Sequence, residues 1–131
     1  MTQQQQYEAY IRACLEAKPQ ELLRGVNPVA DVLLAQADQL RSCIEAGIMP
    51  PVDSLGWTLA KQVHDQWTAE KARQGYTWGP VRNDDSSKGQ DKCHPLMKPF
   101  EELDFAAVKY DLVTAETTLR TAASIVLSTV K

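Results

Sequence analysis

The segment LAKQVHDQWTAEKARQGYTWGPVRND, residues 59–84, combines a helix with an abrupt stop. Leu59, Val63 and Trp67 recur every four residues, which places them on one face of an α-helix. Gly75 suits the end of that helix, because glycine readily adopts the left-handed conformation found at such ends. The helical periodicity disappears beyond it. The segment therefore predicts a helix that leads directly into an irregular region.

The irregular region extends from Tyr76 to Phe100. Turn-forming residues gather in Gly79-Pro80, in the run NDDSS at 83–87 and in the pair that follows it. Such clusters favour reversals of the chain over regular structure. We expect a long loop here, with two short strands or a short β-hairpin at most.

Two further helices are predicted nearer the N-terminus. Tyr7–Lys18 has apolar residues at helical spacing, and Pro19 interrupts that run. Asn27 followed by Pro28 starts a second helix, because Asn caps free amides and Pro is tolerated in the first turn. Gly47 suits its end. The apolar stripe of this helix consists of Val29, Val32, Leu33, Leu40 and Ile44.

Capping residues also mark the later helices. Asp53 or Ser54 can cap the helix of the opening segment, and Asp104 can cap a C-terminal helix. Asp111 followed by Thr114 is a candidate break in that last helix. Its apolar face consists of Phe105, Val108, Leu112, Ala115, Leu119, Ala122 and Val126. The fold class predicted is mainly α.

Length and composition favour one compact unit, because 131 residues with 44% hydrophobic side chains can form a single core. We divide it into a helical N-terminal extension, residues 1–50, and a main domain, residues 51–131. The net charge of -3 gives no overall attraction for DNA, RNA or an anionic membrane. Cys14, Cys43 and Cys93 are widely spaced and odd in number, which indicates reduced thiols in a cytoplasmic protein.

Three signatures follow one another between Leu59 and Thr121. They are HDQWTAEKARQGYTWGPVRND at 64–84, KCHPLMKPFEEL at 92–103 and KYDLVTAET at 109–117. Together they resemble the ryanodine receptor repeat, or RyR domain, over about half of the chain. The family commonly has Trp where this chain has Tyr76, and Tyr where it has Trp78. The loop at 85–91 is also longer than usual, and either change can alter which ligand fits.

The resemblance implies a small helical domain that binds a ligand. In the animal channels the repeats occur in tandem pairs, and the cleft of a pair holds adenine nucleotides between tryptophans. Single copies occur in prokaryotic and phage proteins, where the family context connects them with nucleotide-derived signals. Because one repeat cannot form a tandem cleft alone, the resemblance implies a homodimer or higher homo-oligomer.

The candidate site combines aromatic rings with cations, which suits a nucleobase joined to phosphate. Trp67, Tyr76 and Trp78 would stack on a base, while Lys71 and Arg82 would bind phosphate. Asp84 would accept from a base amine or ribose hydroxyl, and His94 completes the set.

Each of these residues also has a structural interpretation. Trp67 would be a core residue, and Lys71 a solvated one. Arg82 and Asp84 would pair with each other and fix the loop. His94 would anchor the loop by hydrogen bonding, because Pro95 holds it extended.

No catalytic or metal site emerges from the sequence. His64, Cys93 and His94 are the available metal ligands, and they do not form a converging set. Glu116 is expected to be buried against the loop and to cap its amides. The sequence therefore predicts a non-enzymatic nucleotide-binding module without a cofactor, for instance a sponge that sequesters an immune signal. The alternative is a structural or protein-interaction module, in which Trp78 would be buried.

Overall fold

The computed structural model describes residues 2–6, 25–87 and 89–129. The helix predicted for residues 7–18 lies outside these described residues. The rest is mainly helical, as predicted. The elements are α2 (Pro28–Ala46), α3 (Leu55–Arg73), β1 (Thr77–Trp78), β2 (Cys93–His94), the short 3-10 helix η2 (Phe100–Glu102) and α4 (Phe105–Ser128).

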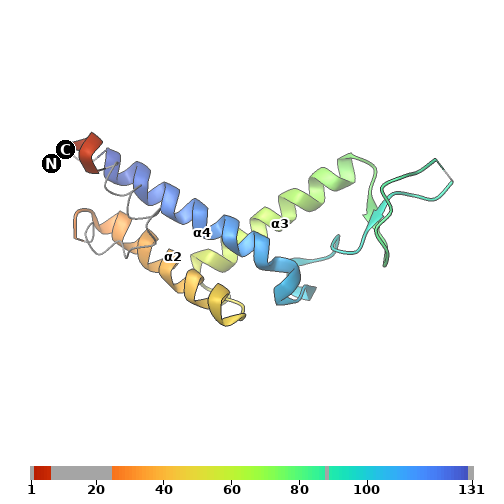
Figure 1. Cartoon of the computed structure of the whole chain (residues 1–131), viewed down its shortest axis with the longest axis horizontal. Coiled ribbons are helices and arrows are strands. Elements are labelled where there is room, and N and C mark those ends of the chain that lie inside the picture. The colour runs from red at the N-terminus through yellow and green to blue at the C-terminus, as the bar shows by residue number, and fades with distance from the viewer. Residues whose placement is uncertain (1, 7–24, 88, 130–131) are drawn as a thin grey trace.

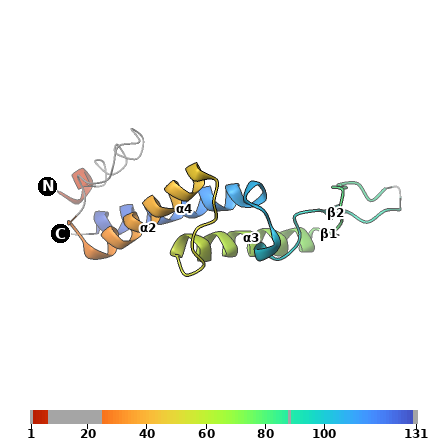
Figure 2. The same ribbon diagram turned by 90° about the horizontal axis from the view of Figure 1, so that it is seen from below.

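The helix α4 is the element on which the other two helices pack. In Figure 1, α2 lies beside the C-terminal half of α4, while α3 crosses α4 and continues away from it. Figure 2 shows α2 and α4 in one layer and α3 in another. The strands β1 and β2 lie beyond the end of α3, far from the C-terminal end of α4 (Figure 1). None of the helices in the described part of the chain has the length and apolar character needed to cross a bilayer.

The helix ends follow the capping residues predicted from the sequence. The Asn27 side chain accepts hydrogen bonds from the backbone amides of the first turn of α2, and Gly47 ends that helix with a φ of 72°. Ser54, rather than Asp53, caps α3. Asp104 caps α4 through a 2.9 Å bond from the Ala107 amide. These ends are set locally, which is why the sequence predicts them well.

The break predicted at Asp111 and Thr114 is wrong, because α4 is continuous from Phe105 to Ser128. The Thr114 hydroxyl donates to the Tyr110 carbonyl at 2.9 Å. A threonine that bonds back to the preceding turn in this way fits inside a helix. Asp111 faces α3 instead of capping a new helix.

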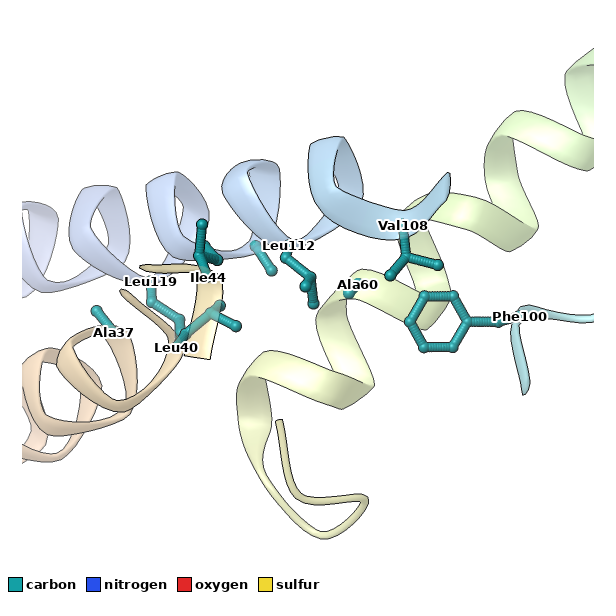
Figure 3. Packing of buried hydrophobic residues seen from close by; sticks show 9 residues of the cluster. Ala37, Leu40, Ile44, Ala60, Phe100, Val108, Leu112 and Leu119 are labelled. Carbon is teal, nitrogen blue, oxygen red and sulfur yellow. The ribbon is translucent and has the colours of Figure 1, made fainter. Parts of the chain in front are cut away.

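The main core forms where the three helices and η2 meet (Figure 3). Phe100, from η2, is fully buried and points toward Ala60 and Val108 (Figure 3). Gly56 brings α3 close to α2, since a Cβ there would lie 2.9 Å from Leu40 Cδ2. The buried members of the cluster are Ala37, Leu40, Ile44, Ala60, Phe100, Val108, Leu112, Ala115 and Leu119.

The buried faces of the helices differ in part from the predicted stripes. Val29 and Val32 are more than half exposed, and α2 instead buries Ala30, Leu34 and Ala37. The buried face of α2 therefore combines alanines with Leu34, Leu40 and Ile44. Near the end of α4, Ala123 and Leu127 are buried where Ala122 and Val126 were predicted. A buried face drifts in this way because 3.6 residues per turn is not a whole number.

Glu116 is buried, as expected, but in a different place. It lies between α2 and α4, where its carboxylate accepts hydrogen bonds from Arg41 and Arg120. Arg120 also reaches Asp38 on α2, 3.2 Å away. Glu116 therefore joins two helices, and the expectation that it caps loop amides is wrong.

The two short strands do not form the hairpin considered above. They pair in parallel, with Trp78 opposite His94. After β1 the chain turns back, and Asn83 makes an antiparallel bridge to the other side of Cys93. The turn depends on Gly79, because a Cβ there would lie 2.5 Å from Cys93 Sγ. Strand β2 therefore forms backbone hydrogen bonds with β1 on one side and with Asn83 on the other.

Candidate functional site

After α3 ends at Arg73, the chain folds back against the last turn of that helix. Gly75 has a φ of 91°, which glycine alone adopts easily. The Tyr76 amide then donates to the Lys71 carbonyl at 3.0 Å. This local turn places the side chain of Tyr76 beside the side chain of Lys71.

Two lysines cover the ring of Tyr76. Lys71 Nζ lies 4.6 Å from the ring centroid, and Lys92 Nζ lies 4.9 Å from it. Both are within the range of a cation–π interaction. The ring is 9% exposed, so these ammonium groups and the loop nearly enclose it. Lys71 comes from α3 and Lys92 from the segment that enters β2.

Asp84 joins Tyr76 to Arg82. The Tyr76 hydroxyl donates to Asp84 Oδ1 at 2.6 Å, and Arg82 Nε donates to the same oxygen at 3.1 Å. These two hydrogen bonds lower the pKa of Asp84, and the bond to Asp84 raises the pKa of Tyr76. The ion pair predicted as the structural interpretation of Arg82 and Asp84 is confirmed. Because Arg82 is exposed, its guanidinium remains accessible from solvent.

Trp67 lies between two histidines. Its ring stacks on His64 at a centroid distance of 5.7 Å and meets His94 edge to face at 4.8 Å. Lys71 Nζ is 6.0 Å from the same ring. Trp67 is partly buried, so packing accounts for much of its role.

His94 anchors the loop, as its structural interpretation predicted. Its Nδ1 accepts a hydrogen bond from the Leu96 amide at 3.1 Å. Burial lowers the pKa of His94, and the nearby charges of Arg82 and Lys71 lower it further. The ring is therefore held neutral, with its proton on Nε2.

Trp78 is the most open aromatic ring of the candidate set. It is 53% exposed, and its indole Nε1 donates to the Pro95 carbonyl at 3.1 Å. One edge of the ring is thus fixed while much of its surface faces solvent. Within the described residues, no ring contact joins it to Trp67 or Tyr76.

The structure therefore gathers most of the predicted site residues. One cluster contains Lys71, Tyr76, Arg82 and Asp84, and an adjoining one contains Trp67 and His94. Sequence reasoning did not include Lys92 in the site. Its position two residues before His94 in an extended segment was the signal that could have found it. In the part of the chain that the structure describes, no three His, Cys, Asp or Glu side chains converge as a metal site.

The family model of the RyR domain matches residues 46–128. This covers more than half of the chain, and the protein belongs to the RyR domain family. The match begins at the last residue of α2 and includes α3, the loop and all of α4. No solved structure matches the chain.

Proposed function

We propose that the protein is a non-enzymatic binding module for a nucleotide or a nucleotide-derived signal. The observation that carries the proposal is the gathering of Lys71, Lys92 and Arg82 around one tyrosine, with the half-exposed ring of Trp78 two residues further along the chain. The membership of the RyR domain family is consistent with it.

Local charge supports an anionic ligand. The cluster has three cations and one carboxylate, Asp84, whereas the whole chain has a net charge of -3. Phosphate oxygens would replace water around Lys71, Lys92 and the exposed side of Arg82. Charge-assisted hydrogen bonds of this kind are stronger than neutral ones.

The exposed ring of Trp78 supports a flat ligand group. Its bond to the Pro95 carbonyl fixes the plane of the ring before a ligand arrives. Stacking of a base on an aromatic side chain contributes about 1–3 kcal/mol. On this proposal Trp78 stacks on the base. Trp67 and Tyr76 hold the neighbouring lysine and histidine side chains in place.

The proposal includes assembly and sequestration. An open ring such as Trp78 can be covered from the other side by a second copy of the chain, which gives a homodimer or higher homo-oligomer. On this proposal the protein would hold its ligand intact and lower its free concentration, as a sponge does.

A thermal-shift screen tests the proposal, because a ligand that binds only the folded state raises Tm. The panel contains adenine and guanine mononucleotides, cyclic di- and trinucleotides and ADP-ribose. We expect one class to raise Tm by several degrees in the wild type and not in Trp78→Ala. Tyr110→Ala is the matched control, because Tyr110 is an exposed aromatic residue on α4, and it should keep the shift. No shift with any nucleotide would contradict the proposal.

Exposed apolar side chains favour a second candidate, a protein-interaction module. Val81 is 74% exposed and lies in the same loop as Trp78. A partner protein would cover both residues. Trp78→Ala would then weaken self-association or partner binding, measured by sedimentation, without any nucleotide effect.

A further inference from the structure

The cations of the candidate site form two groups rather than one. Lys71 Nζ and Lys92 Nζ lie 4.6 Å and 4.9 Å from the centroid of the Tyr76 ring. Arg82 lies beyond the hydroxyl end of that ring, where Asp84 binds both the hydroxyl and the guanidinium. The lysines therefore lie at the ring itself, while the arginine is connected to the ring only through the carboxylate.

Arg82 binds Asp84 through Nε alone. This nitrogen lies 3.1 Å from Oδ1 and 3.1 Å from Oδ2. The two terminal nitrogens, Nη1 and Nη2, have no hydrogen-bond or ion-pair partner among the described residues, and the side chain is 57% exposed. The bond to Asp84 thus orients the guanidinium and leaves its terminal N–H groups for a bidentate contact with an anion.

The two lysines have no carboxylate partner of their own. In the described part of the chain, no Asp or Glu forms an ion pair with Lys71 or Lys92, although both ammonium groups lie beside one ring. Two positive charges beside one ring repel each other, and an anion next to both would relieve that repulsion. Both lysines are partly exposed, so such an anion can approach from solvent.

Asp84 separates the two groups of cations by its charge. The hydrogen bonds from Tyr76 and Arg82 lower its pKa, and the nearby charge of Lys71 lowers it further, so the carboxylate is ionised at neutral pH. A single phosphate that reached both Arg82 and the lysines would have to lie against this carboxylate. Such a contact between like charges is unfavourable, whereas two phosphates, one on each side of Asp84, avoid it.

We infer that the ligand carries two phosphate groups that are not bonded to each other, one at Lys71 and Lys92 and the other at Arg82. The inference rests on the proposed function and narrows its ligand class. A nucleotide with two phosphodiesters or a nucleoside bisphosphate fits this arrangement better than a mononucleotide or a nucleoside diphosphate. Asp84 acts as a positioning residue, because it orients Arg82 and keeps a phosphate from lying between the two groups.

Calorimetric titration of the full chain tests the inference with probes that share one base. Adenosine 5′-monophosphate has one phosphate, ADP has two that are directly linked, and adenosine 3′,5′-bisphosphate has two that the ribose separates. The guanosine counterparts complete the panel. We expect the bisphosphate to bind about tenfold more tightly than the other two, because one further hydrogen bond to a charged group contributes about this factor. ADP is the control for charge alone.

A substitution in either group of cations should abolish this preference. In Arg82→Gln and in Lys92→Gln one group is weakened, so the ratio of the bisphosphate and monophosphate affinities should fall toward one in both variants. Lys61→Gln is the matched control, because Lys61 is a cation on α3 that pairs with Glu101, 2.9 Å away, outside the site. It should keep the ratio of the wild type.

Asp84→Asn tests the separating role of the carboxylate. The amide oxygen can still accept hydrogen bonds from Tyr76 and Arg82, but the negative charge is gone. The monophosphate should then bind more tightly than it does to the wild type, and the ratio should fall. A residue that only supported the fold would not increase affinity when it is replaced.

Wild-type affinities for ADP and for the monophosphate that equal the affinity for the bisphosphate would overturn the inference and leave the proposed function standing. An unchanged ratio in Arg82→Gln would overturn the assignment of the second phosphate. If a variant fails to fold, the comparison of the bisphosphate with ADP on the wild type still decides. If no probe binds, the inference fails, and the thermal-shift screen decides the proposed function by itself.

Discussion

The contact between α2 and α4 is mainly apolar, whereas the region beyond α3 is built from aromatic and charged side chains. In the first region the buried carboxylate of Glu116 accepts hydrogen bonds from Arg41 and from the mostly buried Arg120. In the second, cations lie over rings, and Trp78 remains half exposed. The difference suggests a division of roles, with stability in the helical contact and recognition in the loop. Four predictions test this division.

The largest effect on stability is expected from Phe100→Ala. Phe100 is fully buried and packs where η2 meets the core. Losing a buried phenyl ring costs about 3–5 kcal/mol, because a cavity replaces its contacts. Denaturant unfolding measures this change. A loss below about 1 kcal/mol would mean that η2 is not part of the stable core.

The second-largest loss of stability is expected from removing the buried carboxylate of Glu116. Glu116→Leu removes the carboxylate to which both Arg41 and Arg120 donate, and Arg120 is 17% exposed. We expect a loss of about 2 kcal/mol in the free energy of unfolding, because the mostly buried Arg120 loses one of its carboxylate partners, while Asp38 remains. The matched control is Glu70→Leu, which removes an exposed pair with Arg73 on α3 and should leave stability nearly unchanged. Equal effects of the two substitutions would contradict the comparison.

Lowering the pH should reduce the stability of the folded protein, because protonation of His94 disturbs the loop. Its folded pKa is lowered, so the unfolded chain binds a proton more readily than the folded one. The contribution of His94 is therefore present above the ordinary histidine pKa of about 6.5 and is lost as the pH falls toward the lower folded pKa. Tm measured across this range should fall less in His94→Gln than in the wild type. Identical pH profiles would contradict this role.

The smallest effect on stability is expected at the proposed stacking residue. Trp78→Ala removes a half-exposed ring and one hydrogen bond, so it should cost under about 1 kcal/mol. Its effect on nucleotide affinity should be much larger, because stacking is lost. Denaturant unfolding and a binding titration on the same sample separate the two quantities. A large loss of stability would place Trp78 with the core instead.

Local features of the fold could be predicted well. The caps Asn27 and Asp104 act on amides two or three residues away, and Arg82 pairs with Asp84 two residues along. The turn at Gly75 follows from the same short range. Caps, turns and ion pairs of this kind involve residues that are close together in the chain, so their residue types and spacing are enough to predict them.

Features that depend on distant segments could not be predicted from the residues alone. The exposure of Val32 depends on which face of α2 meets α4, and the parallel pairing of β1 with β2 depends on the path of the loop. The position of Lys92 over Tyr76 requires that pairing.

The sequence by itself determined the helical class, the helix ends, the residue types of the site and the resemblance to the RyR domain. Only the tertiary structure decided that Glu116 joins two helices, that Lys92 covers Tyr76 and that His64 faces Asp111. The physical reason is range. Caps and turns act between near neighbours in the chain, whereas burial and ion pairing depend on which faces meet after packing.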